Sequence, residues 1–292
     1  MHKSVLLSEA LENLNCRNGS VVLDCTLGCA GHAVEILKKI SPDGMLIGLD
    51  ADNLAVNKSA EILREFGKNF RLFNENFCCF DKVLASLGIG QVDAVLFDLG
   101  ISSLQLDDGQ RGFSFSNSGP LDMRLDRTKG RPLWEMLETM TENQIGNIIR
   151  TFGEERYWRT ISRAIVEAGR ISPIYDSGRL AAVITNAVGR KYAQRINPAT
   201  RAFQAFRIFV NDELKSIESA LLKVPGFLKK NGRIVAISFH SLEDRIVKHT
   251  LRAFAKDGLL RVITKKPIRP REEEIVLNPR ARSAKMRSAE RI

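Results

Sequence analysis

Four apolar segments in the first hundred residues, separated by helical patterns, constrain the fold of this chain more than any other feature. The strand patterns cover Val21–Cys25, Met45–Asp50, Phe70–Glu75 and Val92–Asp98. The helical patterns between them cover Gly31–Ile40, Asn53–Phe66 and Phe80–Leu87. Strands that alternate with helices in this way form a parallel sheet with helices on both faces. The sequence therefore predicts an α/β fold with a mostly parallel sheet.

The loop after the first strand has the composition of a nucleotide-binding turn. Asp24 ends the strand, Gly28 and Gly31 follow, and a helix starts at Gly31. Glycines let the backbone approach a ligand, and free N–H groups at a helix N-terminus face it. The spacing is D-x-x-x-G-x-x-G, which lacks the close glycine pair of the dinucleotide fingerprint G-x-G-x-x-G. The loop thus favours a nucleotide without a pyrophosphate.

The alternating pattern stops after the fourth strand. Gly, Ser, Asp and Asn are frequent from Leu99 to Pro120. Mainly helical patterns follow, over Leu133–Met140, Glu142–Phe152, Glu155–Ala168 and Ser177–Val188. We therefore expect a helical insert within the α/β domain.

The α/β pattern resumes near residue 200. We expect one long helix over Thr200–Leu222, a buried strand over Gly232–Phe239, and a helix that Ser241 caps. Weaker strand patterns cover Leu260–Thr264 and Ser283–Arg291. The predicted division is an α/β domain of residues 1–120 and 200–292 and an insert of residues 121–199, expected to recognise the substrate.

Composition indicates a globular protein of the cytoplasm. Apolar residues make up 44% and charged residues 27% of the 292 residues, which suits a sizeable core. No apolar run is long enough for a transmembrane helix, and the N-terminus does not resemble a signal peptide. The five cysteines form no C-x-x-C pair, so we expect reduced thiols and no metal site.

The balance of charge favours a polyanionic partner. The formal net charge is +10, and positive residues concentrate in Lys265–Arg271 and Pro279–Arg287, on either side of Glu272–Glu274. A basic balance suits nucleic acid, although charge alone also serves solubility.

Polar or aromatic residues follow the other strands of the predicted sheet. Asp50 lies 26 positions after Asp24, near the offset at which an acid binds ribose hydroxyls, or it caps the next helix. Phe77 covers an adenine ring or packs in the core, and the second fate is commoner for a lone Phe. Asp98 orients a ligand amine or serves as a turn carboxylate. Because strand ends meet at one edge of a parallel sheet, these residues form one candidate site.

Carboxylates at this edge distinguish two nucleotide ligands. Asp24 and Asp98 would repel a pyrophosphate but suit the ammonium and sulfonium groups of S-adenosylmethionine. Asp98-Leu99-Gly100-Ile101-Ser102-Ser103 stands where amino-methyltransferases have their target-amine motif. Acceptors there would bind the N–H groups of an exocyclic amine and direct its lone pair to the methyl group.

Motifs along nearly the whole chain resemble one family, the bacterial 16S rRNA (cytosine-N4)-methyltransferases of the small-subunit methyltransferase H family. Their shared order makes the resemblance specific. The motifs are His2–Leu7, Asp24–His32, Leu96–Asp107, Arg111–Phe115, Gly119–Arg124, Gly153–Arg156, Asn197–Ala205, Ser238–Arg245 and Asn278–Ser283.

This resemblance implies a class I S-adenosylmethionine-dependent methyltransferase fold, Rossmann-like, with a helical insert. The cofactor contacts that it implies are Ala30, Gly31, His32, Asp50, Phe77, Asp98 and Gln105. The chain departs from the family at Ala30, where a glycine is usual, and at Leu104, where a proline is usual. A backbone contact at Ala30 survives such a change.

The resemblance also implies the reaction, which is methylation of N4 of a decoding-centre cytidine in 16S rRNA. Phe113 or Phe115 would stack on the extruded base, or they pack under the glycine-rich loop. His240, Ser241 and Asp244 would hold the cytidine, or they form a helix cap with a structural histidine. Asp98 is the candidate catalytic residue.

Three other functions fit parts of the sequence. The first is an amino-methyltransferase for DNA or another RNA. The second is a catalytically idle RNA-binding or ribosome-assembly factor that keeps the fold. The third is an NAD-dependent oxidoreductase, which the glycine spacing disfavours. The expected partners are 16S rRNA and the small ribosomal subunit, without a membrane.

Overall fold

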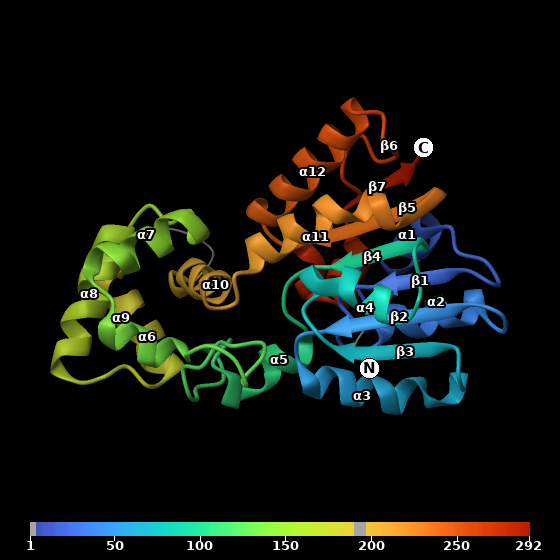
Figure 1. Cartoon of the computed structure of the whole chain (residues 1–292). Coiled ribbons are helices and arrows are strands. Elements are labelled where there is room, and N and C mark those ends of the chain that lie inside the picture. The colour runs from blue at the N-terminus through green and yellow to red at the C-terminus, as the bar shows by residue number, and fades with distance from the viewer. Residues whose placement is uncertain (1–3, 190–196) are drawn as a thin grey trace. The chain divides into compact units, whose positions relative to one another are not determined.

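The computed structural model describes residues 4–189 and 197–292, which form two compact units (Figure 1). The first unit comprises Met1–Ser102 and Leu214–Ile292, and the second Ser103–Glu213. The sequence-based boundaries of the insert, residues 121–199, start later and end earlier than the second unit. His2 and Lys3 of the first family motif, and the insert residues 190–196, lie outside the described residues.

A seven-stranded sheet runs through the described residues of the first unit in the order β3-β2-β1-β4-β5-β7-β6. The strands are β1 (Val21–Asp24), β2 (Met45–Asp50), β3 (Phe70–Asn74), β4 (Val92–Asp98), β5 (Leu228–Ser238), β6 (Leu260–Val262) and β7 (Lys285–Arg291). The first five are parallel, whereas β7 is antiparallel to β5 and β6. The chain reverses direction across the sheet between β1 and β4, which is where open α/β sheets bind ligands. The expected fold class is confirmed.

Helices cover both faces of this sheet (Figure 1). They are α1 (Leu7–Leu14), α2 (Gly31–Ile40), α3 (Asn53–Leu63), α4 (Phe80–Ser86), α11 (Glu213–Phe227), α12 (Ser241–Lys256) and α13 (Glu272–Leu277). Short 3-10 turns add η1 (Arg64–Phe66), η2 (Phe77–Cys79) and η5 (Pro279–Ser283). The helices predicted between the first four strands are present, while α1 was not predicted.

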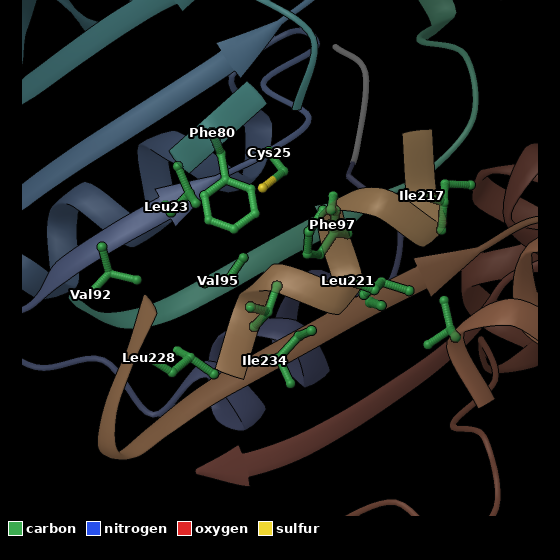
Figure 2. Packing of buried hydrophobic residues seen from close by; sticks show 14 of the residues in the cluster. Leu23, Cys25, Phe80, Val92, Val95, Phe97, Ile217, Leu221, Leu228 and Ile234 are labelled. Atoms are coloured by element: carbon green, nitrogen blue, oxygen red, sulfur yellow. The ribbon is translucent and has the colours of Figure 1, made fainter. Parts of the chain in front are cut away.

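Alternate residues of each strand enter two separate cores. Leu23 and Phe97 belong to a core that α4, α11 and α12 cover. Val22 and Leu96 belong to a core on the opposite face, which α1 and α2 cover. Figure 2 shows the first core, where the Phe80 ring of α4 lies close to Leu23. Because side chains alternate along a strand, a parallel sheet buried on both faces reads as a continuous apolar run.

The second unit is helical, as the sequence predicts for the insert. Its helices are α5 (Ser103–Asp107), α6 (Leu133–Thr139), α7 (Glu142–Gly153), α8 (Trp158–Ile171), α9 (Ser177–Val188) and α10 (Ala199–Val210), with the 3-10 turn η3 (Gly109–Arg111). The α7 helix begins with a reciprocal cap. Thr141 Oγ1 accepts from the Gln144 N–H at 3.3 Å, and Gln144 Oε1 accepts from the Thr141 N–H at 2.8 Å.

The single helix predicted over Thr200–Leu222 is wrong, because α10 ends at Val210 and α11 starts at Glu213. Asn211 ends α10 with its side chain: Nδ2 donates to the Arg207 carbonyl at 2.8 Å, and Oδ1 accepts from the Leu125 N–H at 2.7 Å. Asp212 then adopts a left-handed φ of 48°. The amphipathic spacing continues through this break, so periodicity does not reveal it.

Among residues 4–189 and 197–292, no helix has both the length and the apolar character needed to span a bilayer.

Candidate functional site

The loop after β1 is fixed across the ends of three strands. The Cys25 N–H donates to the Leu96 carbonyl of β4, and the Leu27 N–H to the Leu49 carbonyl of β2, both at 2.9 Å. The Gly28 N–H donates to Asp50 Oδ2, also at 2.9 Å. These bonds hold the loop at the reversal point of the sheet, at the C-terminal ends of its central strands.

Two loop residues have a left-handed backbone. Gly28 has a φ of 52° and Ala30 a φ of 58°. Glycine adopts this conformation freely, whereas an alanine pays roughly 1–2 kcal/mol for it. The α2 helix then begins at Gly31, where a methyl group would overlap the Ser4 hydroxyl. The departure at Ala30 therefore keeps the backbone path expected of a glycine.

Asp50 organises the loop with both carboxylate oxygens. Oδ2 accepts from Gly28, and Oδ1 accepts from the Asp52 N–H at 2.8 Å. The cap of α3 is Asp52, whose Oδ1 accepts from the Leu54 N–H at 3.1 Å. The alternative that Asp50 caps this helix is therefore wrong.

Asp24 is a buried carboxyl with a strongly perturbed pKa. Burial raises its pKa from 3.8 to about 7, a hydrogen bond from the Thr26 N–H opposes the rise, and the charge of Asp50 adds to it. That hydrogen bond, at 3.1 Å, ends on Oδ1. Near neutral pH, Asp24 is poised between its charged and neutral forms, and a nearby cation favours the charged form.

Asp98 stands at the end of β4, next to Asp24. Burial raises its pKa well above the ordinary value, and the charges of Asp24 and Glu243 raise it further. Its N–H donates to Thr26 Oγ1 at 2.6 Å, which ties β4 to the loop. The side chain as a whole is 22% exposed, but its Oδ1 atom is buried and has no hydrogen-bond partner in the described part of the chain. An unpartnered buried acceptor of this kind is costly unless a ligand satisfies it.

His32 joins Asp98 to the N-terminal segment. Its Nε2 lies 3.2 Å from the Val5 carbonyl, and its Nδ1 lies 3.4 Å from Asp98 Oδ2. Because a carbonyl only accepts, Nε2 carries the proton of a neutral ring, and Nδ1 then accepts. A protonated Asp98 donates to Nδ1 through Oδ2, which leaves Oδ1 as a free acceptor. The pair fixes which oxygen of Asp98 meets a ligand.

Phe77 lies in η2, beyond the end of β3, and is half-buried. Its ring packs edge-on against Phe97, with the ring centroids 5.8 Å apart. Asn76 begins the turn, because its Oδ1 accepts from the Cys78 N–H at 2.9 Å. Core packing and partial exposure therefore coexist at Phe77, so one part of the ring remains able to cover a base.

The residues after β5 form a cap and an ion pair. His240, not Ser241, caps α12: its Nδ1 accepts from the Glu243 N–H at 3.4 Å, and Glu243 Oε2 accepts from the His240 N–H at 3.2 Å. Asp244 accepts from Arg287 Nε of β7 at 2.7 Å. Burial alone would raise the Asp244 pKa, but Arg287 and the charge of Lys285 lower it. This geometry favours the structural interpretation of His240 and Asp244, and leaves Ser241 exposed.

Three predicted residues lie in the second unit. Gln105 is buried in α5. Phe113 is 6% exposed, with the Arg111 guanidinium 5.6 Å from its ring centroid. Phe115 packs edge-on against Phe203 at 5.3 Å and is half-buried. Packing accounts for Phe113, whereas Phe115 keeps a partly open ring.

Sequence reasoning missed three contributors to the site. Thr26 links the loop to β4, Val5 fixes the His32 ring, and the buried Glu243 raises the Asp98 pKa. Glu243 has a local signal, since an acid three residues after a helix cap forms a capping box. The contacts of Thr26 and Val5 join segments far apart in the chain and have no local signal.

Comparison with known proteins identifies the same family as the sequence motifs. The family model described as the MraW methylase family matches residues 1–292. Ribosomal RNA small subunit methyltransferase H of Geotalea uraniireducens is 45% identical, over 100% of this chain and 98% of the relative. Its namesake in Syntrophus aciditrophicus is 43% identical with the same coverage. The solved structure of PH0851 is 12% identical with a TM-score of 0.50, over 99% of this chain and 46% of that one, which supports the fold alone.

Proposed function

The chain belongs to the MraW methylase family, and we propose that it transfers a methyl group from S-adenosylmethionine to N4 of a decoding-centre cytidine in 16S rRNA. The names of its full-length relatives support a small-subunit rRNA substrate. We further propose the cytoplasm as its location, where that RNA is made and assembled. The resemblance drawn from the motifs supplies the cytidine N4 target.

One observation of the structure carries the cofactor assignment. Asp24 and Asp98, two carboxyls with raised pKa values, lie beside Asp50 at the reversal point of the sheet. Acidic groups this close favour a bound cation, because a positive charge offsets their mutual repulsion. The ammonium and sulfonium groups of S-adenosylmethionine supply such charge, whereas the pyrophosphate of a dinucleotide adds negative charge. The residues present therefore fit this cofactor.

The cofactor-binding residues divide by the part of the ligand they suit. We propose that Asp50 accepts from ribose hydroxyls and that Phe77 covers the adenine. The backbone at Ala30 and Gly31 and the ring of His32 border the rest of the ligand. Gln105, in the second unit, remains a proposed contact that rests on the family motif.

The reaction needs little from the chain beyond positioning. When bound, S-adenosylmethionine would supply an electrophilic methyl group: the amine nitrogen bonds to the methyl carbon as the carbon–sulfur bond breaks, the neutral thioether leaves, and the methylated amine then loses one proton. Asp98 Oδ1 accepts a hydrogen bond from the N–H of the target amine and so turns the nitrogen lone pair toward the methyl group. A barrier reduction of this kind comes from orientation and fixed electrostatics. His32 holds Oδ2 and keeps Oδ1 aimed at the amine.

The direct test compares 16S rRNA from strains with and without this protein by mass spectrometry. Loss of N4-methylcytidine in the deletion strain is expected, and an unchanged level would exclude the proposed reaction. Methyl transfer to a DNA or another RNA instead would support the first rival function. Binding of the cofactor and RNA without any transfer would support the idle assembly factor.

A pair of variants tests the role of Asp98. Asparagine would keep an acceptor oxygen at this position and a donor toward His32, so the informative change is Asp98→Ala, which removes the acceptor. Oδ1 has no hydrogen-bond partner to lose within the described residues, so the fold should survive. We expect transfer to fall by at least a hundredfold, because removal of one stabilising contact in a transition state costs about that much. Asp257→Ala, on the exposed end of α12, is the matched control and should keep full activity. Near-normal turnover by the Asp98 variant would refute the role.

A further inference from the structure

A strongly basic surface lies on α12 and the segment after β6. Its exposed or half-buried cations are Lys248, Arg252 and Lys256 of the helix, and Lys265 and Lys266 after the strand. None of these five forms an ion pair with a carboxylate within residues 4–189 and 197–292. We call these five residues the α12–β6 surface.

The helical cations occupy one stripe of α12. Lys248, Arg252 and Lys256 are spaced four residues apart, which places them on the same face of a helix. Like charges at this spacing destabilise a helix. Asp244 lies one turn before Lys248 and could offset its charge. However, Asp244 accepts a hydrogen bond from Arg287 at 2.7 Å and lies 3.6 Å from Lys285. The stripe therefore carries uncompensated charge in the free protein.

A small pocket extends this surface toward the sheet. Its lining combines four cations, Lys248, Arg252, Lys265 and Arg287, with Thr264 and an apolar floor of Leu251 and Val262. None of these lining residues has a carboxylate. The Arg287 side chain is 10% exposed, and its guanidinium is fixed by two hydrogen bonds to Asp244. A concave site with several cations and one rigid guanidinium suits a phosphate group.

The sheet order places this surface within reach of the proposed methyl-transfer site. β6 is the third strand from β4 in the order β4-β5-β7-β6. With neighbouring strands about 4.8 Å apart, the two strands lie about 14 Å from each other. Lys265 follows the end of β6 that lies at the same edge as Asp98, because β6 is antiparallel to β7 and so parallel to β5. A polyanion that enters the site can thus follow the surface along α12.

We propose that the α12–β6 surface binds the phosphodiester backbone of the substrate rRNA, and that its pocket holds one phosphate. This inference rests on the proposed function and adds to it the place where the RNA backbone docks. Unpaired cations in a row match the regular charges of a nucleic-acid strand, and release of counterions from that strand drives binding. These contacts position the RNA and carry no sequence information.

A triple variant, Lys248→Gln with Arg252→Gln and Lys265→Gln, tests the surface. Glutamine has a helix propensity close to that of lysine and arginine, and the changes relieve repulsion in α12, so the thermal midpoint should stay or rise. We expect the KM for small ribosomal subunits that lack the modification to rise about tenfold or more near 150 mM salt. The kcat value and the affinity for S-adenosylmethionine should remain near those of the unchanged protein.

The salt dependence gives a second readout. The slope of log affinity against log salt should decrease by about 2, because each lost phosphate contact removes 0.7–0.9. The matched control is Lys58→Gln with Arg64→Gln and Lys68→Gln, three exposed cations of α3 and the residues after it, near β3 at the opposite edge of the sheet. Both variants lower the formal charge from +10 to +7.

The outcomes separate the surface from the function. Loss of RNA affinity in the α12–β6 variant alone supports the surface. Equal loss in both triple variants, or no loss in the first, overturns it, while methylation by the unchanged protein leaves the proposed function intact. If the unchanged protein neither binds nor methylates the subunits, the proposed function itself fails, and the surface proposal with it.

Discussion

Replacing Asp24 by asparagine removes the ionised form of a carboxyl that the fold buries at 1% exposure. The folded-state pKa of about 7 lies above the ordinary value of 3.8. A raised carboxyl pKa means that the folded protein holds the proton more tightly than the unfolded chain. The contribution to stability is therefore complete below pH 3.8 and is lost as the pH rises toward 7. Asp24→Asn has no such pH dependence.

The expected size follows from the same pKa values. One pKa unit corresponds to about 1.4 kcal/mol, so ionising Asp24 in the fold costs about 4 kcal/mol in total. Between pH 5 and pH 8.5, the contribution of Asp24 to the free energy of unfolding falls by about 3 kcal/mol. Relative to the unchanged protein, Asp24→Asn should therefore become more stable by about 3 kcal/mol as the pH rises from 5 to 8.5. Any constant effect of the amide cancels in this comparison.

Urea unfolding without ligand at the two pH values measures this difference. Asp257→Asn, on the exposed end of α12, serves as the control and should follow the unchanged protein at both. S-adenosylmethionine should stabilise the unchanged protein more than Asp24→Asn at pH 8.5, because its positive charge offsets the buried carboxylate. A difference in unfolding free energy between Asp24→Asn and the unchanged protein that is the same at pH 5 and pH 8.5 would refute the reasoning.

Three further substitutions have defined outcomes. Phe97→Ala removes a fully buried ring of β4 from the core that α4, α11 and α12 cover, and should lower the free energy of unfolding by about 3–5 kcal/mol. A loss under about 1 kcal/mol by urea titration would contradict the packing shown in Figure 2. Ala30→Gly relieves a left-handed backbone but loses a buried methyl group. Calorimetry should therefore find an affinity for S-adenosylmethionine within about twofold of that of the unchanged protein. A large loss of this affinity would show that the methyl group itself contacts the ligand. Arg287→Met leaves Asp244 without its main partner and should lower the free energy of unfolding by about 2 kcal/mol at pH 7. Because Arg287 lowers the Asp244 pKa, this loss should shrink as the pH falls below the ordinary pKa of an aspartate. A loss that stays the same at all pH values would exclude the ion pair as the source of the stability.

Strong periodicity made the first half of the fold predictable. The β2 and β4 strands and the α2 helix have the bounds that the sequence predicts, because long buried runs end at acids, glycines or prolines. The later half was less predictable where a side chain overrides periodicity. Asn211 ends α10 through bonds to residues about 87 positions away, and no local pattern contains that information.

The helix cap after β5 shows the same limit at a smaller scale. Serine is the commoner cap, and it favoured Ser241, yet His240 takes the position because its ring and Glu243 bond to each other's backbone N–H. The choice depends on an extended backbone at His240, which β5 imposes as it leaves the sheet. One residue of difference changes which side chain can face a ligand.

The sequence by itself determined the first four strands and the helices between them, the acids at the strand ends and the family. Each of these follows from local periodicity or from motifs in a fixed order. Only the tertiary structure decided the chemistry of the acids. Asp24, Asp50 and Asp98 come from separate strands, and the pKa values of Asp24 and Asp98 depend on burial and on the charges of neighbouring acids. The His32 ring, held by the Val5 carbonyl, then selects the Asp98 oxygen left for a ligand. Desolvation and charge interactions act through space, so distance in the fold sets them and distance along the chain does not.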